Sequence, residues 1–453
     1  MSQSECFVLP EIRVWAQQQW GPTDLGDARR TQRAVAVGAA LAAATEKGLP
    51  EQMGSWAATK AAYRLLDEPA VTHEALCQPH WAATRAAAAA QPGVVLFVQD
   101  DMMADLSSHR AFTGAGPIGD GRGRGFYTHN CLALEAQSGA VLGLAHQAVW
   151  ARQAGAAGPA RTARLAADRS GGVGRGPGGH RPGASRGHLG QRGRPQLRRL
   201  WPLGAGARLG LALPDPGLPG PGAGGGGRLL EHARGLEAQA ERTVTLREGN
   251  RRVQRVLKVA WAPVTIQATA HRAPAGAERP APIQAWVIRA WAEGVEWVLL
   301  STLAIESQAE AFERLDWYGQ RWTIEDYHKG LKTGCRLEQR QVRTAGRFTA
   351  LLGFLSVVAV RLLQGRDQAR RAPEAPVAEP ALTQRVLAGA LGVALSSVAT
   401  NRGFWRGVAR LGGFLARKSD GEPGWQTLWR GWDKLQTMLA GIELAQKAAA
   451  KCG

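Results

Sequence analysis

The chain has 453 residues and a formal net charge of +19, from 56 Lys and Arg against 37 Asp and Glu. A chain of this length buries a full hydrophobic core without disulfide staples, which excludes a disulfide-built miniprotein. The basic excess favours a polyanionic partner, either a nucleic acid or an anionic membrane face. The longest apolar stretch, residues 349–360, is too short to span a bilayer and is followed by Arg361, so we expect no membrane insertion.

Cysteine usage and the N-terminal residues favour a cytoplasmic protein. The five cysteines are an odd number without C-x-x-C spacing, which favours reduced thiols over a disulfide framework or a zinc site. The segment MSQSECFVLPEIRVW has no basic stretch followed by an apolar one, as a secretion signal has.

Residues 24–90 are rich in alanine and predict a helical domain, with helix stops before Pro50 and Pro69. Arg29 and Arg33 are four residues apart, as are Lys60 and Arg64, so each pair lies on one helix face. Such a face is either simply solvated or in contact with phosphates, and the spacing alone leaves both interpretations open.

The next segment predicts strands. Residues 93–99 form an almost wholly apolar run that ends in Asp100 and Asp101, and an acid at the end of a buried strand needs an explanation. Residues 126–135 and 140–150 predict a β-hairpin around Gln137-Ser138-Gly139. The glycines of GDGRGRG precede a strand rather than a helix, so a flexible basic loop is favoured over a phosphate-binding loop.

Residues 153–227 have an aberrant composition. They hold 22 glycines, 9 prolines and 11 arginines, but only two acids and no Glu, Lys, Ile, Phe, Tyr or Met. One interpretation is a disordered basic linker, because such a sequence buries too little apolar surface to offset chain entropy. The favoured interpretation is a folded segment now read out of frame, because G+C-rich DNA in a wrong frame encodes mainly Gly, Arg, Ala and Pro.

Beyond this segment the pattern becomes regular again. Residues 229–237 predict a helix, and residues 238–303 predict strands that pair mostly antiparallel. Helices resume at Ser307, residues 372–380 resemble a linker, and residues 381–453 predict a last helical unit.

The most specific motif is Y-x2-R-x3-E-x6-K, formed by Tyr318, Arg321, Glu325 and Lys332. On one continuous helix these four side chains share a polar face, within roughly 60° at 100° per residue. The opposite face is then apolar and carries Ile324, Tyr327 and Leu331. The alternative is an amphipathic surface helix with an Arg-Glu pair four residues apart.

With this motif the chain resembles the bacterial cut-and-paste insertion-sequence transposases of the DDE class. The resemblance also rests on DLGDARRTQR, AAYRLLDEPAVT, VQDDMMADLSSH, HQAVWAR, FLSVVAVRLLQ and GGFLARKSDGEPGWQTLWRGWDKLQ, which occur in the family's order. It implies an α+β fold with three parts. These are a helical DNA-binding domain (residues 1–90), a ribonuclease-H-like core (91–372) with an antiparallel β insertion (238–303), and a helical dimerisation domain (381–453).

The resemblance also implies roles for particular residues. Asp100 matches the family's first catalytic Asp and Glu325 its Glu, and both are then ligands of Mg²⁺ or Mn²⁺, which prefer oxygen donors. Tyr318, Arg321 and Lys332 are then expected to hold phosphates, and Trp297 either stacks on a flipped base or packs in the core. The expected contacts of the N-terminal domain with DNA are Arg29, Arg30, Arg33, Lys60 and Arg64.

The chain departs from the family at two places. Asp101 and Met102 follow Asp100 where the family usually has two threonines. The second catalytic Asp belongs in residues 153–227, where Asp168 lies in a polar stretch and Asp215 between two prolines, so neither has the strand context. Two hypotheses follow. The chain is either a metal-dependent transposase, impaired in this copy, or a non-catalytic DNA-binding and dimerising relative. The expected partners are double-stranded inverted-repeat ends, target DNA and a second copy when bound to DNA, with no membrane.

Overall fold

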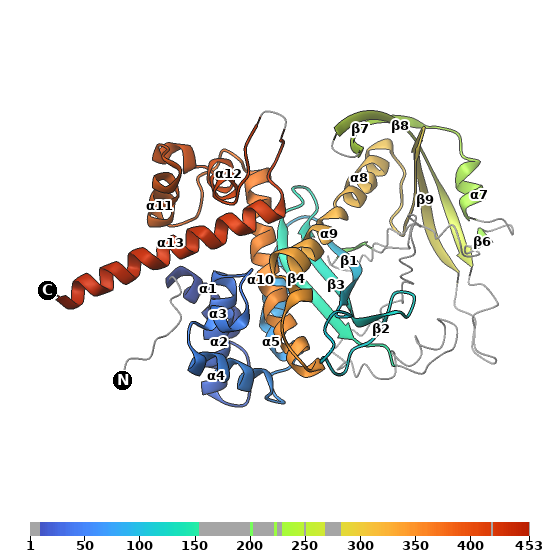
Figure 1. Cartoon of the computed structure of the whole chain (residues 1–453). Coiled ribbons are helices and arrows are strands. Elements are labelled where there is room, and N and C mark those ends of the chain that lie inside the picture. Colours follow the sequence, from blue (N-terminus) through green and yellow to red (C-terminus); the bar gives the residue numbers. More distant parts are fainter. Residues whose placement is uncertain are drawn as a thin grey trace. The chain divides into compact units, whose positions relative to one another are not determined.

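The computed structural model describes residues 10–153, 200–202, 222–223, 229–248, 251–267, 282–417 and 420–452 (Figure 1). The chain divides into two compact units. The first unit comprises Met1–Ala90, Met102–Gly155 and Thr323–Gly453, and the second comprises Gln91–Asp101 and Ala156–Trp322. The described elements are helices and antiparallel strands, so the predicted α+β class is confirmed.

The first unit begins with helices, as the sequence predicts for this region. They are α1 (Pro10–Trp20), α2 (Ala28–Ala43), α3 (Leu49–Met53), α4 (Trp56–Leu66) and α5 (His73–Ala89). The side chains of Asp27, Ser55 and Thr72 cap α2, α4 and α5 by accepting backbone N–H groups. The expected stop before Pro50 is wrong in detail. The preceding helix ends at Ala43, and Pro50 lies in the first turn of α3, where a missing N–H costs nothing.

A β-sheet follows, with the strand order β2-β3-β1-β5 and with β4 also paired with β3. Its strands in the first unit are β2 (Gly116–Ile118), β3 (Gly123–Glu135), β4 (Val141–Trp150) and the end of β1 (Val95–Asp105). The predicted hairpin of β3 and β4 is confirmed, with antiparallel pairs from Tyr127 with Trp150 to Leu134 with Val141. Gly125 is required on β3, because a Cβ there would lie 1.9 Å from the Ala104 carbonyl oxygen.

The central helix of the first unit is α10 (Ala345–Arg371), which packs on α5 and β4. Among the described helices it alone has the length and hydropathy to cross a membrane, but 78% of its most apolar window is buried inside the protein. The helix is therefore part of the protein core.

The first unit ends with α11 (Ala381–Leu391), α12 (Asn401–Leu411) and α13 (Trp425–Cys452). Two glycines let α12 and α13 approach closely. A Cβ on Gly412 would lie 1.8 Å from the Thr427 carbonyl oxygen, and one on Gly431 would lie 1.7 Å from that of Val408. The rings of Trp405 and Trp432 stack at 5.5 Å across this contact.

The second unit contains the predicted antiparallel strands. β5 (Leu200–Pro202) pairs with residues 96–98 of β1. A separate sheet has the order β10-β9-β8-β6, with β7 also paired with β8. Its strands are β6 (Gly222–Ala223), β7 (Ala240–Glu248), β8 (Arg251–Gln267), β9 (Ile283–Ala292) and β10 (Val295–Ser301).

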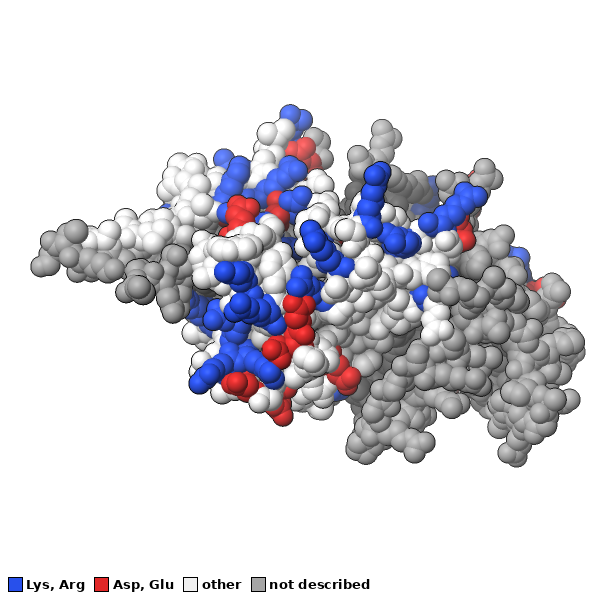
Figure 2. Space-filling model, turned by 60° about the horizontal axis from the view of Figure 1, so that its bottom comes forward, with Lys and Arg blue, Asp and Glu red and all other residues white. Residues whose placement is uncertain are grey.

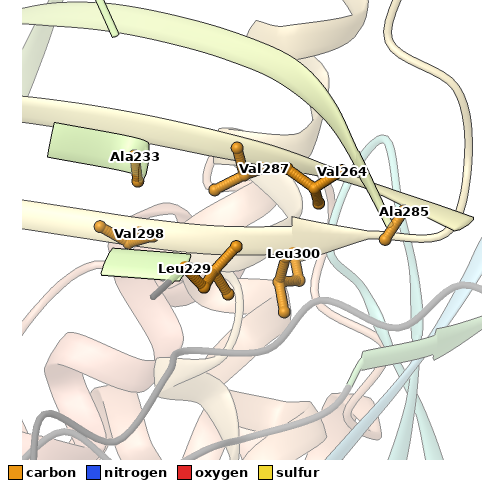
Figure 3. Packing of buried hydrophobic residues seen from close by; sticks show 7 residues of the cluster. All are labelled: Leu229, Ala233, Val264, Ala285, Val287, Val298 and Leu300. Carbon is orange, nitrogen blue, oxygen red and sulfur yellow. The ribbon is translucent and has the colours of Figure 1, made fainter. Parts of the chain in front are cut away.

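Helices complete the second unit. One face of the separate sheet packs on α7 (Leu229–Arg234), and α8 (Gln308–Gly319) follows β10 along the chain. Figure 3 shows the small apolar core between α7 and the sheet, which is formed by Leu229, Ala233, Val264, Ala285, Val287, Val298 and Leu300.

Candidate functional site

On two of the N-terminal helices, four of the basic side chains are exposed: Arg29 and Arg33 on α2, and Lys60 and Arg64 on α4. Within the described part of the chain, none of the four forms an ion pair with a carboxylate. Arg30 differs, because it pairs with Glu68 at 2.7 Å and donates to the Leu25 carbonyl. Figure 2 shows one face of the molecule. On this face Lys and Arg side chains gather in patches, and Asp and Glu side chains are fewer than Lys and Arg. The four residues are suited to bind a polyanion.

The N-terminus of α2 supports the same conclusion. Arg29 and Arg30 lie in its first turn, which holds no acidic residue. A helix N-terminus carries a partial positive charge, so a cation there costs about 0.3–1 kcal/mol rather than stabilising the helix. Helix stability therefore does not explain Arg29, which has no carboxylate partner among the described residues, whereas an external anion would.

The signature residues do not lie on one continuous helix, so the predicted common face is wrong. α8 ends at Gly319, Arg321 lies in the turn, α9 (Trp322–Lys329) follows, and residues 330–334 form a π-helical turn. Tyr318 and Arg321 are only 7% and 6% exposed instead of forming a solvated polar face. The apolar side is confirmed, because Ile324, Tyr327 and Leu331 are fully buried.

Three predicted site residues come together in the second unit. The ring of Trp297, on β10, lies 5.8 Å from that of Tyr318, on α8. The Arg321 guanidinium lies 5.6 Å from the Tyr318 ring and 4.3 Å from the Trp322 ring. Trp297 is half-buried. Its packing against Tyr318 is compatible with both roles foreseen for it, stacking on a base and packing within the protein.

The other two signature residues lie in the first unit. Glu325 is half-buried on α9. The Lys332 ammonium pairs with Glu338 Oε1 at 2.8 Å, and the same oxygen accepts the backbone N–H of Asp105 at 2.9 Å. Lys332 therefore already has an intramolecular anionic partner, which any phosphate bound by Lys332 would have to replace.

A buried polar network holds α9 against the sheet. Gln147 on β4 accepts hydrogen bonds from His73 and Ser356 through Oε1, at 2.7 and 2.6 Å. Its Nε2 donates to Asn130 Oδ1 at 2.6 Å and to the Tyr327 hydroxyl at 3.2 Å. Burial lowers the pKa of His73 to about 4, so this imidazole is neutral at neutral pH.

The network extends to the residue after Tyr327. Asn130 Nδ2 donates to His328 Nε2 at 2.9 Å and to Thr128 Oγ1 at 3.0 Å. Tyr327 and His328 are two and three residues after Glu325, so these bonds fix the helix segment that carries Glu325.

The other side of α9 is tied to the C-terminal helices. Asp326 forms an ion pair with Arg366 of α10 and accepts a hydrogen bond from Trp425 Nε1 of α13 at 3.4 Å. The Arg366 guanidinium also lies 4.3 Å from the Trp425 ring. Although burial opposes ionisation, the bond and charge of Arg366 keep the pKa of Asp326 below its ordinary value. The segment with Glu325 is thus anchored to α10 and α13 as well.

Asp100 is 8% exposed and lies inside β1 rather than directly after the strand, which continues to Asp105. Its Oδ1 accepts the backbone N–H of Asp101 at 2.9 Å. Asp100 belongs to the second unit and Glu325 to the first, so a shared metal site of the two carboxylates stays a prediction.

The described residues do not fit a metal site with three carboxylates. No group of three or more His, Cys, Asp or Glu side chains among them is arranged to hold a metal ion. Asp168, Asp215 and all of residues 153–227 except 153, 200–202 and 222–223 lie outside the described residues.

Comparison with protein families gives two matches. Residues 12–71, which include α2 to α4, match the model described as "Transposase DNA-binding". Residues 398–452, which include α12 and α13, match the "Transposase Tn5 dimerisation domain". The two matches lie within the predicted helical segments 1–90 and 381–453, and the first includes all five basic residues foreseen as DNA contacts. The chain thus has the DNA-binding and dimerisation domains of a bacterial insertion-sequence transposase.

Proposed function

We propose that this chain binds the terminal inverted repeats of an insertion sequence as a dimer, in the cytoplasm of a bacterium. The observation that carries the proposal is the location of Arg29, Arg33, Lys60 and Arg64. They are exposed, they lack a carboxylate partner among the described residues, and they lie within the matched DNA-binding domain. Phosphate contacts by such side chains supply most of the sequence-independent affinity for DNA.

The proposed reaction is strand cleavage and strand transfer, a phosphoryl transfer on DNA, with Asp100 and Glu325 at the reacting phosphate. Arg321 and Tyr318 are proposed to hold a neighbouring DNA phosphate, and Lys332 another after exchanging Glu338 for it. A guanidinium suits this role because it donates two parallel hydrogen bonds to one phosphate. We propose a base-stacking role for Trp297, whose ring lies beside Tyr318.

This copy is proposed to be impaired in cleavage. The family's second catalytic Asp would be the third carboxylate of the site. It has no counterpart among the described residues, and in residues 153–227 neither Asp168 nor Asp215 has the sequence context of a strand. The second candidate function, a non-catalytic protein that binds DNA and dimerises, is favoured by this same observation. Both functions share the DNA-binding step and differ only in whether the bound strand is cut.

The test is cleavage by the purified chain with Mg²⁺ or Mn²⁺ on DNA that carries the element's inverted repeats. It is run beside a chain whose residues 153–227 are restored to the other reading frame. We expect cutting by the restored chain alone. The chain as written lacks one carboxylate that stabilises the transition state, and each ~1.36 kcal/mol of lost stabilisation lowers the rate tenfold. Equal cutting by the two chains would show that the aberrant segment is a tolerated linker and that the site is complete.

A further inference from the structure

Trp56 is the first residue of α4 and is 69% exposed. Single exposed apolar side chains are common on protein surfaces, so this exposure alone indicates nothing. What distinguishes Trp56 is its surroundings. The Lys60 ammonium lies 5.5 Å from the centre of its ring, and Arg64 is exposed one turn further along.

Helix geometry makes these three residues a stripe. At 100° per residue, Lys60 and Arg64 lie roughly 40° and 80° from Trp56 around the axis of α4. The opposite side of the helix is buried through Thr59, Ala62, Leu65 and Leu66. The packing of α4 therefore does not depend on Trp56, and Ser55 caps the helix independently of it.

The charge around Trp56 favours one kind of occupant. Lys60 and Arg64 have no carboxylate partner among the described side chains, and the stripe lies within the matched DNA-binding domain. An indole next to two cations can pack its apolar face on a deoxyribose, a thymine methyl group or a base, while the cations contact the flanking phosphates. A protein partner at this surface would have to be strongly acidic.

We infer that Trp56 contacts DNA directly, as an uncharged contact placed between the phosphate contacts of the α4 stripe. This inference rests on the DNA-binding part of the proposed function. It adds a contact whose free energy does not depend on counterion release. Affinity lost with Trp56 is therefore lost equally at all salt concentrations, whereas affinity lost with Lys60 is lost mainly at low salt.

The test uses the full chain and two duplexes, one with the element's terminal repeat and one of mixed sequence. Affinity is measured against salt for the wild type, Trp56→Ala, Trp56→Phe and Lys60→Gln. Trp56→Ala should weaken binding by about tenfold, in the range for loss of one stacked aromatic, with an unchanged salt slope. Trp56→Phe should restore part of the loss. Lys60→Gln should reduce the slope by about 0.9.

Val14→Ala is the matched control, because Val14 is also apolar and 59% exposed, on α1 of the same domain. It should leave binding unchanged, and no variant should change the melting temperature appreciably. If the wild type binds DNA with a steep salt slope and Trp56→Ala binds as tightly as the wild type at every salt concentration, the inference is overturned but the proposed function is not. A change of oligomeric state in Trp56→Ala would overturn the inference, because it would show that Trp56 contacts a second copy of the chain instead of DNA. A wild type without salt-dependent DNA binding overturns the proposed function and the inference together.

Discussion

Lys332 and Glu338 form an ion pair of 2.8 Å between the π-helical turn after α9 and the next short helical turn. The carboxylate also receives the backbone N–H of Asp105 at the end of β1. The lysine of the signature is therefore held by its own chain in the absence of DNA. If Lys332 binds a phosphate, part of its interaction energy with DNA is offset by losing Glu338.

This relationship predicts that Glu338→Gln strengthens DNA binding. The variant removes the competing carboxylate but keeps an oxygen that can accept the Asp105 N–H. Partly exposed ion pairs contribute about 0.2–1 kcal/mol, so we expect about 1.5- to 5-fold tighter binding at low salt. Glu374→Gln is the control, because it removes the same charge at another ion pair. Glu374 lies in the linker before α11 and pairs with Arg402 of α12. Weaker binding by Glu338→Gln alone would exclude a phosphate contact of Lys332.

The basic face of α2 predicts a change in salt dependence. Replacing Arg29 and Arg33 together by Ala should reduce the slope of log affinity against log salt by about 1.8, because each phosphate contact contributes about 0.9. The control is Arg385→Ala, which removes an exposed arginine from α11, outside the matched DNA-binding domain. Equal slopes for the double variant and the control would show that the α2 arginines form only a solvated face.

The sequence predicts local pairings better than it predicts breaks and burial. The hairpin of β3 and β4 was foreseeable because two apolar segments flank a short polar turn. The sequence did not predict that the helix carrying the signature ends at Gly319, because apolar residues continue at helical spacing beyond this position. The glycine itself was the one residue that could have indicated a helix end there. Trp56 was missed because an aromatic residue in a helical pattern is usually interpreted as core, and a pattern does not reveal which face lacks a neighbour.

The buried network was also beyond sequence reasoning, because His73, Asn130, Gln147, Tyr327 and Ser356 meet only through tertiary packing. It predicts that Gln147→Leu strongly destabilises the chain. The apolar replacement leaves several buried polar groups unpaired, at about 1–3 kcal/mol each. We expect a loss of about 3–5 kcal/mol in the free energy of unfolding, measured by urea titration. Ser356→Ala removes one donor and should cost about 1 kcal/mol. Similar costs for both would show that Gln147 is not the centre of the network.

A buried histidine, His73, and a half-buried one, His80, predict that stability falls on acidification. Burial lowers the pKa of His73 and of His80 to about 4. His80 is neutral by its bonding, because Nε2 accepts the Leu144 N–H at 3.2 Å while Nδ1 donates to Gln19 at 2.8 Å. Below the ordinary histidine pKa of about 6.5, the unfolded chain binds protons that the folded chain does not, so the free energy of unfolding decreases as pH falls towards 4.

From about pH 7 to about pH 5, each of these histidines should lower the stability by about 2 kcal/mol, at 1.36 kcal/mol per unit of pH below its unfolded pKa. The measurement is urea unfolding of the wild type and of His80→Gln at both pH values. The variant lacks one of the two groups, so its acid-induced loss should be smaller by about that amount, and carboxylates that titrate in both proteins cancel in the comparison. The same acid-induced loss in the variant and the wild type would show that His80 takes up its proton equally in the folded and unfolded chain, contrary to its half-buried position on α5 with both ring nitrogens hydrogen-bonded.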